Sequence, residues 1–219
     1  MRLLIMGPPG VGKGTMAKHI NNVYHIPHIS TGELYREAIT KMTPIGKLAK
    51  DFLDRGELVP DDITVTLVKR TLKNENYQKG FLLDGFPRTI PQAQALDDIL
   101  KQNNWKIDMV LNLLADDELL IERISGRRTC KKCGELYHII NKKPKIRNIC
   151  DQCGGILFQR PDDNRETVAH RLKVYQEQTQ SLLEYYHQRH LLRNINGAGT
   201  IEENIAEVEK ILGGFNDND

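Results

Sequence analysis

The sequence predicts an α/β fold built on a doubly wound parallel sheet. Short apolar runs recur along the chain, and runs of this length suit strands that are buried in a parallel sheet. The four clearest runs span residues 3–6, 81–83, 109–114 and 191–195. Helical patterns separate them. This alternation of strand and helix is typical of a doubly wound sheet, whose ligands bind at the carboxyl ends of the strands.

The clearest helical pattern lies toward the C-terminal end. Its mainly apolar and aromatic side chains alternate at spacings of four and three residues, which places them on one face of a helix. They are Val168, Leu172, Tyr175, Thr179, Leu182 and Tyr186. A second helix is expected to start behind Asp61 and Asp62, after Pro60, and to include Ile63 and Leu67.

Two segments interrupt the alternation, and we interpret both as insertions into one core. Residues 30–59 have the pattern of short helices, and residues 126–163 contain all four cysteines but few apolar runs. The core then consists of residues 1–29, 60–125 and 164–219. Its last residues, 213–219, are too polar to pack, so we expect them to form a frayed tail.

The composition excludes several classes of protein. A chain of 219 residues with 39% hydrophobic and 27% charged residues is an ordinary globular protein rather than a disordered or fibrous one. A formal net charge of +2 argues against a main role in wrapping nucleic acid. The N-terminal apolar run stops at Gly7, and no run approaches the roughly 18 apolar residues of a membrane span. We therefore expect a cytoplasmic protein that does not contact membranes.

A glycine-rich loop follows the first predicted strand. Residues 7–15 read Gly-Pro-Pro-Gly-Val-Gly-Lys-Gly-Thr, and apolar residues at helical spacing come next. Successive glycines allow backbone N–H groups to surround an anion, the helix N-terminus adds its positive dipole end, and Lys13 supplies a mobile charge for the outer phosphates. Such a loop could instead be a simple turn between strand and helix, but the order of strand, loop and helix favours phosphate binding. We call residues 7–15 the phosphate loop.

One position in the phosphate loop departs from the common pattern. Gly14 follows Lys13 where Ser or Thr is usual, so that the hydroxyl of Thr15 is displaced by one residue. Direct ligation of magnesium by this hydroxyl therefore stays open.

A carboxylate ends the second predicted strand. Asp84 directly follows the apolar run 81–83 and precedes Gly85. A sheet of this type delivers such a residue to the ligand site, where it would orient magnesium directly or through water. The alternative is that Asp84 only caps the turn at Gly85.

Arginines are suited to phosphoryl transfer, which needs positive charge around the transferred group more than covalent chemistry. Arg123 and Arg127 are four residues apart and share a helix face if the helix from Glu118 continues that far. The other candidates are scattered through the chain, and spacing alone does not assign them a role.

The four cysteines predict a metal site. Cys130 and Cys133 form one C-x2-C pair, Cys150 and Cys153 form another, and sixteen residues separate the pairs. This spacing is typical of zinc sites, and four thiolates leave no coordination position open, so the metal would be structural. Disulfides are less expected in a chain with no secretory signal, and redox-active cysteines less still. The choice between zinc and iron stays open.

The chain closely resembles the adenylate kinase family over nearly its whole length. Six motifs occur in the family's order: GPPGVGKGT, HISTGELYREA, RGELVPDDI, GFLLDGFPRTIPQA, RISGRR and QRPDDNRETVAHRL. The resemblance implies transfer of a phosphoryl group from ATP to AMP, giving two ADP, with magnesium and without a phosphorylated enzyme intermediate. It also implies two mobile parts, which we call the insertion (residues 30–59, expected to bind the monophosphate) and the lid (residues 126–163). Gly126 and residues 161–163 are the expected hinges.

The resemblance implies roles for individual residues. Lys13, Asp84, Arg88, Arg123, Arg127, Arg160 and Arg171 are expected to be catalytic. The expected ATP contacts are Gly10, Val11, Gly12, Lys13, Gly14, Thr15, Arg127, Leu136, Tyr137 and Gly199. The expected AMP contacts are Thr31, Arg36, Glu57, Leu58, Val59, Gly85, Phe86, Pro87, Arg88, Gln92, Arg160 and Arg171. Related lids contain zinc, which here would be bound by Cys130, Cys133, Cys150 and Cys153.

Two rival functions remain to be separated from this one. A kinase for UMP, CMP or GMP would share the fold and mechanism, although Thr31 and Gln92, which lie by the AMP base in the family, favour adenine. A nucleic-acid-binding module would fit the lid, where residues 126–160 contain nine Lys and Arg against Glu135 and Asp151. The phosphate loop does not belong to such a module, so we expect no nucleic-acid partner. We also expect a monomer.

Overall fold

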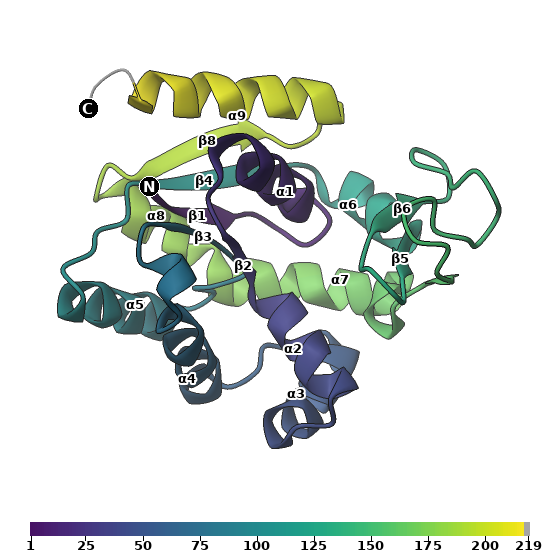
Figure 1. Cartoon of the computed structure of the whole chain (residues 1–219), viewed down its shortest axis with the longest axis horizontal. Helices are drawn as coiled ribbons and strands as arrows, with labels where there is room; N and C mark the ends of the chain where they lie inside the picture. Colours follow the sequence, from purple (N-terminus) through teal and green to yellow (C-terminus); the bar gives the residue numbers. More distant parts are fainter. Residues whose placement is uncertain (217–219) are drawn as a thin grey trace.

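A parallel five-stranded sheet forms the centre of the computed structural model, which describes residues 1–216 (Figure 1). The strands lie in the order β2-β3-β1-β4-β8, and each neighbouring pair is parallel. Their bounds are β1 (Arg2–Met6), β2 (His28–Ser30), β3 (Phe81–Asp84), β4 (Met109–Leu114) and β8 (Leu192–Asn196). The predicted doubly wound α/β fold is confirmed, with strands at all four apolar runs.

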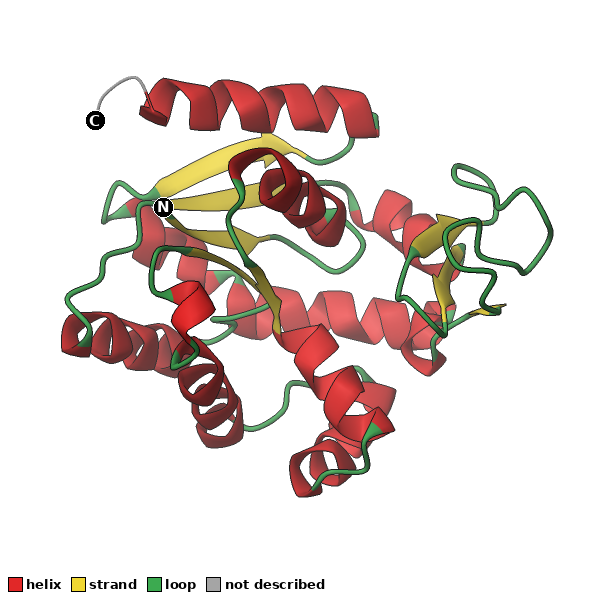
Figure 2. Cartoon of the chain, viewed as in Figure 1, coloured by secondary structure: helices red, strands yellow, loops and turns green. Residues whose placement is uncertain are grey.

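Helices cover both faces of this sheet (Figure 2). Leu3 and Ile5 of β1 pack with residues of α1 (Lys13–Tyr24), α6 (Asp117–Ser125), α7 (Arg165–Val174) and α9 (Ile201–Asn216). Leu4 and Met6 pack on the other face with residues of α4 (Asp61–Leu72), α5 (Ile90–Gln102) and α8 (Ser181–His187). Because both faces are covered, successive side chains of β1 are apolar rather than alternating with polar ones.

The predicted C-terminal helical stripe is interrupted. A π-helical turn, η3 (Tyr175–Thr179), separates α7 from α8. A π-turn accommodates one more residue than an α-helical turn, so side chains beyond it rotate relative to those before it. As a result Val168 and Leu172 pack in the core of one sheet face, whereas Leu182 and Tyr186 pack in that of the other. The predicted helix after Pro60 is α4.

The insertion contains two helices, α2 (Thr31–Thr40) and α3 (Pro44–Arg55). Ser30 and Thr43 cap them, because each side-chain oxygen accepts a hydrogen bond from a backbone N–H in the first helical turn. A small separate core of Tyr35, Ala49 and Val59 forms at the insertion, and side chains of α4 pack against it. The insertion is therefore attached to the main sheet through α4 and β2.

The lid contains a second sheet, which is antiparallel and has the order β6-β5-β7. Its strands are β5 (Arg127–Cys130), β6 (Leu136–His138) and β7 (Leu157–Phe158), and the short helix η2 (Pro161–Asp163) follows. The buried core of the lid consists of Cys130, Tyr137, Cys150 and Leu157. So little apolar surface cannot stabilise an independent unit without a cross-link or a metal.

The C-terminal end differs from the expectation of a frayed tail at 213–219. Helix α9 continues through Asn216, and residues 217–219 lie outside the described part of the chain. Val208 and Leu212 are fully buried against the sheet, and helical hydrogen bonding extends past this last anchored turn. The remaining short helix is η1 (Glu75–Tyr77). Within residues 1–216, no helix is both long enough and apolar enough to cross a membrane.

Candidate active site

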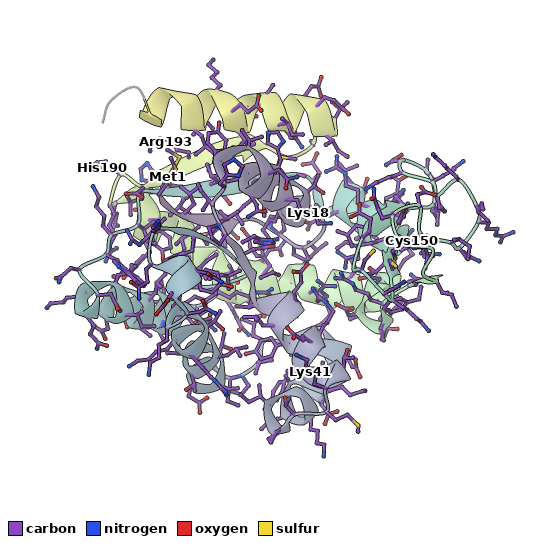
Figure 3. The ribbon with its side chains drawn as sticks, viewed as in Figure 1. Met1, Lys18, Lys41, Cys150, His190 and Arg193 are labelled. Carbon is purple, nitrogen blue, oxygen red and sulfur yellow. The ribbon has the colours of Figure 1, made fainter. Side chains whose placement is uncertain are left out.

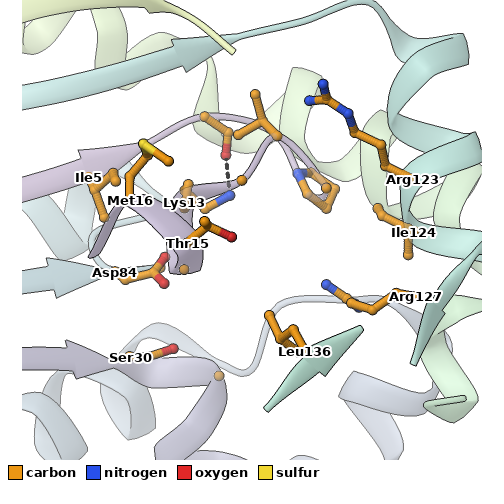
Figure 4. A pocket seen from close by; sticks show the side chains of 18 of the residues that line it. Ile5, Lys13, Thr15, Met16, Ser30, Asp84, Arg123, Ile124, Arg127 and Leu136 are labelled. Carbon is orange, nitrogen blue, oxygen red and sulfur yellow. Dashed lines mark hydrogen bonds between the residues drawn. The ribbon is translucent and has the colours of Figure 1, made fainter. Parts of the chain in front are cut away.

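A cavity of about 810 Å³ opens at the carboxyl ends of β1 and β3. Its walls come from the phosphate loop, the insertion, the lid and the loop between β8 and α9. Figure 4 shows Lys13, Asp84, Arg123, Arg127 and Leu136 around it, from four separate parts of the chain. The cavity therefore lies where a doubly wound sheet presents its ligand site, with the two inserted segments on its sides.

The phosphate loop connects β1 to α1 with three glycines at positive φ. Gly7 has φ +131°, and a Cβ built there would lie 2.4 Å from the carbonyl oxygen of Leu113. Gly7 is thus required both by its backbone conformation and by its close approach to β4. Gly12, with φ +102°, has no heavy atom within 4 Å of the position of a Cβ, so the backbone there is open to the cavity. The first N–H groups of α1 follow directly, at a helix N-terminus with no side-chain cap.

Lys13 is directed back across the phosphate loop. Its ammonium donates hydrogen bonds to the carbonyl oxygens of Gly7, at 2.7 Å, and Pro8, at 2.8 Å. Burial lowers the pKa of Lys13 to about 8, although the nearby carboxylate of Asp84 opposes this shift and the cations Arg88, Arg171 and Arg127 add to it. The ammonium is therefore less solvated than an ordinary surface lysine and gains strongly from an anion placed at the loop.

Asp84 ends β3 and is 8% exposed. Its Oδ2 lies 3.4 Å from Nε2 of His28, on the neighbouring strand β2. Burial alone would raise the pKa of Asp84, but His28, Lys13 and Arg88 together hold it below its usual range. The carboxylate is therefore ionised at neutral pH and directed toward the phosphate loop (Figure 4), as ligation of a divalent cation requires.

Six arginines line the same cavity, Arg123 and five others. Arg36 comes from α2, Arg88 follows β3, Arg127 begins β5, Arg160 precedes η2 and Arg171 lies in α7. Two adjacent carboxylates orient part of this group. The fully buried Asp163 accepts two hydrogen bonds from Arg127, and Asp162 accepts one from Nη1 of Arg171 at 2.8 Å.

The arginine charges are only partly compensated. Burial lowers the pKa values of Arg36, Arg88, Arg160 and Arg171, and charge repulsion from neighbouring guanidinium groups lowers each of them further. Arg127 differs, because its hydrogen bonds to Asp163 outweigh burial and raise its pKa. A buried group of cations that destabilise one another is a favourable site for polyanions such as the phosphates of nucleotides.

Arg123 and Arg127 do not share a helix face, because the helix from Glu118 does not continue as far as Arg127. Helix α6 ends at Ser125, Gly126 caps it, and Arg127 lies in β5. The antiparallel pairing of β5 with β6 holds residues 127–129 in an extended conformation, so the helix cannot continue through them. Both side chains nevertheless reach the cavity. The guanidinium of Arg123 donates hydrogen bonds to the carbonyls of Gly197, Ala198 and Gly199 in the loop before α9.

Most of the residues predicted for the site line the cavity, and four do not. Those that line it are Gly10, Val11, Gly12, Lys13, Gly14, Thr15, Arg36, Glu57, Leu58, Asp84, Gly85, Pro87, Arg88, Arg123, Arg127, Leu136, Tyr137, Arg160, Arg171 and Gly199. Thr31, Val59, Phe86 and Gln92 are buried behind its wall.

Thr31 and Gln92, the two polar residues among these four, form hydrogen bonds with other residues of the chain. The hydroxyl of Thr31 donates to the carbonyl of Gly85 at 2.8 Å. The amide of Gln92 accepts a hydrogen bond from the backbone N–H of Arg88 and donates one to Asp61. Both side chains therefore orient the loop after β3. Val59 packs in the core of the insertion and Phe86 in the main core.

The structure adds cavity residues that the sequence analysis missed. Tyr175 and Thr179, from the π-turn, form part of the wall, and no sequence signal marks a π-turn. Lys18 of α1 and Glu135 of the lid also line the cavity, and their charged groups pair at 2.7 Å. Figure 3 labels Lys18 on the side of α1 that faces the lid. The spacing of 117 residues between these partners explains why they were not recognised.

The four cysteines form one cluster, and all of their sulfur atoms lie within 4.8 Å of one another. Every cysteine of the chain is in the described part, and none forms a disulfide. Tetrahedral zinc with Zn–S bonds of about 2.3 Å requires sulfurs roughly 3.8 Å apart. The Cys130–Cys153 and Cys133–Cys150 sulfur distances are 3.5 and 3.6 Å. The residues therefore fit a tetrathiolate metal site.

Backbone conformation supports this cluster. Gly134 and Gly154, which follow the two C-x2-C pairs, have φ of +74° and +69°. These left-handed turns curve the backbone back around the sulfurs, and the N–H of Lys132 donates to the sulfur of Cys130 at 3.4 Å. Burial alone would raise the pKa of the Cys150 thiol, but hydrogen bonds from Tyr137, from two backbone N–H groups and from Cys133 lower it. These hydrogen bonds favour the thiolate form of Cys150.

Comparison with known proteins gives one consistent result. The sequence matches the family model described as adenylate kinase over residues 5–191. A protein named adenylate kinase from Geobacillus sp. (strain WCH70) is 51% identical over 98% of this chain and 100% of its own length. Proteins of the same name from Archaeoglobus fulgidus and Bacillus subtilis are 49% identical, over 97% and 98% of this chain and 98% and 99% of their own lengths.

Proposed function

Since the chain belongs to the adenylate kinase family, we propose that it transfers the terminal phosphoryl group of ATP to AMP, reversibly and with Mg²⁺, to give two ADP. The enzyme is a phosphotransferase of the nucleoside monophosphate kinase class. The observation that supports the proposal best is the convergence of the phosphate loop, Asp84 and six arginines on one cavity. That cavity, at about 810 Å³, is within the size range of sites that enclose small-molecule ligands.

The phosphate loop and Lys13 would bind the phosphates of ATP. Backbone N–H groups of Gly10 to Thr15 supply neutral donors, and the Lys13 ammonium would exchange its two loop carbonyls for phosphate oxygens. Asp84 would hold Mg²⁺ beside the loop, directly or through water. Bound there, the metal would neutralise charge between the phosphates of ATP.

The arginines would surround the transferred group. Arg36 and Arg88 would approach from the AMP side, and Arg123 and Arg127 from the ATP side. Arg160 of the lid and Arg171 of α7 would complete the group. Positive charge fixed on several sides stabilises the equatorial oxygens of the transition state and aligns the two nucleotides. No nucleophilic side chain is needed, so transfer is direct.

The two bases would occupy opposite ends of the cavity. Glu57, Leu58, Gly85 and Pro87 line the end near the insertion, where AMP is expected. Thr31, Val59, Phe86 and Gln92 would act from behind this wall by orienting it rather than by contact. Leu136, Tyr137 and Gly199 line the end near the lid, where the adenine of ATP is expected.

The insertion and the lid would close over the nucleotides. Closure excludes water, which would otherwise accept the phosphoryl group. Gly126 and η2 are suited to be hinges of the lid, because they connect its small sheet to α6 and α7. The positive charge of the lid would attract the phosphates of the nucleotides, so the proposal requires no nucleic-acid partner. The enzyme would act as a cytoplasmic monomer.

The cysteine cluster would bind a structural zinc ion. Four thiolates complete the coordination of zinc, so the ion would take no part in phosphoryl transfer. Its contribution would be to stabilise the lid, whose apolar core contains only four buried residues.

The experiment that tests the function presents Mg²⁺-ATP with AMP, UMP, CMP, GMP or dTMP in separate reactions and follows the diphosphates formed. We expect rapid consumption of AMP and slow consumption of the others. Rapid use of another monophosphate would agree with the mechanism but refute the assignment of AMP as the substrate. Lys13→Ala is the control, and it should lower turnover by orders of magnitude without changing the fold. If none reacts although ATP binds, the kinase proposal fails, and binding of DNA or RNA at physiological salt is measured instead.

A further inference from the structure

Tyr137 lies between the cysteine cluster and the nucleotide cavity. It is the middle residue of β6, and it lines the cavity together with its neighbours Leu136 and His138. The Tyr137 side chain is 4% exposed and packs in the lid core with Cys130, Cys150 and Leu157. Since successive residues of a strand face opposite sides, β6 presents one face to the nucleotide and the other to the metal site.

The hydroxyl of Tyr137 is bonded to the cysteine cluster. It donates to the sulfur of Cys150 at 3.5 Å and accepts a hydrogen bond from the backbone N–H of Asp151 at 2.7 Å. The N–H of Asp151 occupies one acceptor position of the hydroxyl oxygen, and the hydroxyl proton is directed at the sulfur.

A tetrathiolate site needs such donors. Four thiolates around a divalent ion have a net charge of about −2, and Cys130 and Cys150 are each only 2% exposed. Hydrogen bonds to the ligand sulfurs spread this charge and orient the ligands. Among the described residues, Tyr137 supplies the one side-chain hydrogen bond to a cysteine sulfur that does not come from another cysteine.

We infer that Tyr137 is a positioning residue of the lid metal site: its hydrogen bond to Cys150 strengthens metal binding and fixes β6 against the metal cluster. This inference rests on the proposed structural zinc. It adds a second link between the metal site and the cavity wall. The first is β5, which contains both Arg127 and Cys130, and the second bonds β6 through Tyr137 to Cys150. Lys142, whose ammonium lies 5.4 Å from the centre of the Tyr137 ring, further encloses the ring.

The test is Tyr137→Phe in the full chain, which keeps the ring and removes the hydroxyl. Zinc affinity is measured by competition with a chromophoric chelator, and we expect it to fall roughly 10- to 100-fold. The protein is also loaded with Co²⁺ at saturating metal. Without the hydrogen bond the sulfur electrons of Cys150 are less stabilised, so the thiolate-to-cobalt absorption band should shift to longer wavelength.

Tyr35→Phe is the matched control. Tyr35 is equally buried, and its hydroxyl bonds to Thr64 at 2.8 Å, far from the cysteines. This variant should lose stability but keep the zinc affinity and cobalt spectrum of the unaltered chain. An affinity for Tyr137→Phe within twofold of that chain, together with an unshifted band, would overturn the inference. Failure of the unaltered chain to bind zinc or cobalt would instead refute the proposed metal site.

Discussion

At the scale of single residues, the site is defined by cations that lack full compensation. Lys13, Arg36, Arg88, Arg160 and Arg171 all have lowered pKa values, and burial is the first cause in each case. The carboxylates that face them balance only part of this charge. Nucleotide phosphates would supply the rest, so binding and charge compensation are one event.

The lowered pKa of Lys13 predicts how ATP affinity depends on pH. Below pH 8 the side chain is an ammonium that attracts phosphate, and above pH 8 it becomes neutral in the free enzyme. Bound phosphate favours the ammonium, so a proton must be taken up on binding at high pH. The Kd for ATP should therefore rise roughly fivefold from pH 8 to pH 9.

Isothermal titration calorimetry between pH 7 and pH 9.5 checks this dependence. Lys13→Met is the control, because it cannot titrate, and its weaker binding should not change between pH 8 and pH 9. A Kd for the unaltered enzyme that is constant over this range would show that the ammonium is an ordinary solvated one.

Asp163 predicts a stability effect. Its carboxylate is fully buried and bonded to Arg127, and Nη1 of Arg171 lies 3.6 Å away. Asp163→Asn would leave these guanidinium groups without their counter-charge. We expect the free energy of unfolding to fall by about 3 kcal/mol. This is the lower end of the range for broken buried ion pairs, because the side chain of Arg127 is 18% exposed.

The midpoint and slope of urea denaturation measure this change. Asp54→Asn is a suitable comparison, since Asp54 pairs with Lys50 on the exposed surface of α3 and should not alter the midpoint. Equal midpoints for Asp163→Asn and the unaltered chain would mean that the Asp163 pair contributes nothing to stability.

The positions of residues at the cavity were predictable from sequence where the residues are contiguous. The phosphate loop is contiguous, so its glycines and Lys13 could be interpreted directly, and Asp84 follows an obvious strand. Gln92 shows the limit. Its position in the family motif suggested a base contact, whereas its amide is bonded to Arg88 and Asp61 behind the wall. Side-chain direction depends on neighbours that lie far away in the sequence.

At the scale of elements, periodicity predicted four of the strands and the helices α1, α4 and α7, but it missed β2, the long helices α5 and α9, and the π-turn. β2 has three residues, of which only Ile29 is an apolar buried one, so it gives no pattern. The π-turn at Tyr175 was invisible because the stripe of apolar residues continues through it at helical spacing. The end of α6 was missed because strand pairing in the lid, rather than local propensity, determines it.

The lid is the element whose stability would depend most on the proposed metal. Replacing Cys130 and Cys150 by Ser removes two of the four ligands and should lower Tm by several degrees, since structural zinc contributes roughly 10 kcal/mol or more of apparent binding free energy. Phosphoryl transfer measured well below Tm should change less. Differential scanning calorimetry checks the first expectation and a coupled ADP assay the second.

Chelation provides the control for the cysteine variant. A strong zinc chelator should lower Tm of the unaltered protein toward that of the variant and should not affect the variant itself. An identical melting curve for the variant and the unaltered protein would contradict the structural role of the metal.

At the scale of the whole molecule, the active site is assembled from segments that the sequence separates widely. The phosphate loop, Arg88, Arg127, Arg160 and Arg171 meet because the sheet order brings β1 and β3 together and because both insertions return to the same edge. Sequence patterns identified the insertions but not their approach to each other. That approach depends on contacts of α3 with η2, whereas the pair of Lys18 with Glu135 joins α1 to the lid.

This assembly has one central consequence, which is that the terminal phosphoryl group of ATP should pass to AMP and not to water. The most direct measurement uses Mg²⁺-ATP labelled with ³²P in its terminal phosphate, with and without AMP, and separates labelled ADP from labelled inorganic phosphate. The account predicts that with AMP nearly all label appears in ADP, with two ADP formed for each ATP consumed. Release of label as inorganic phosphate at a comparable rate, with AMP present, would contradict it.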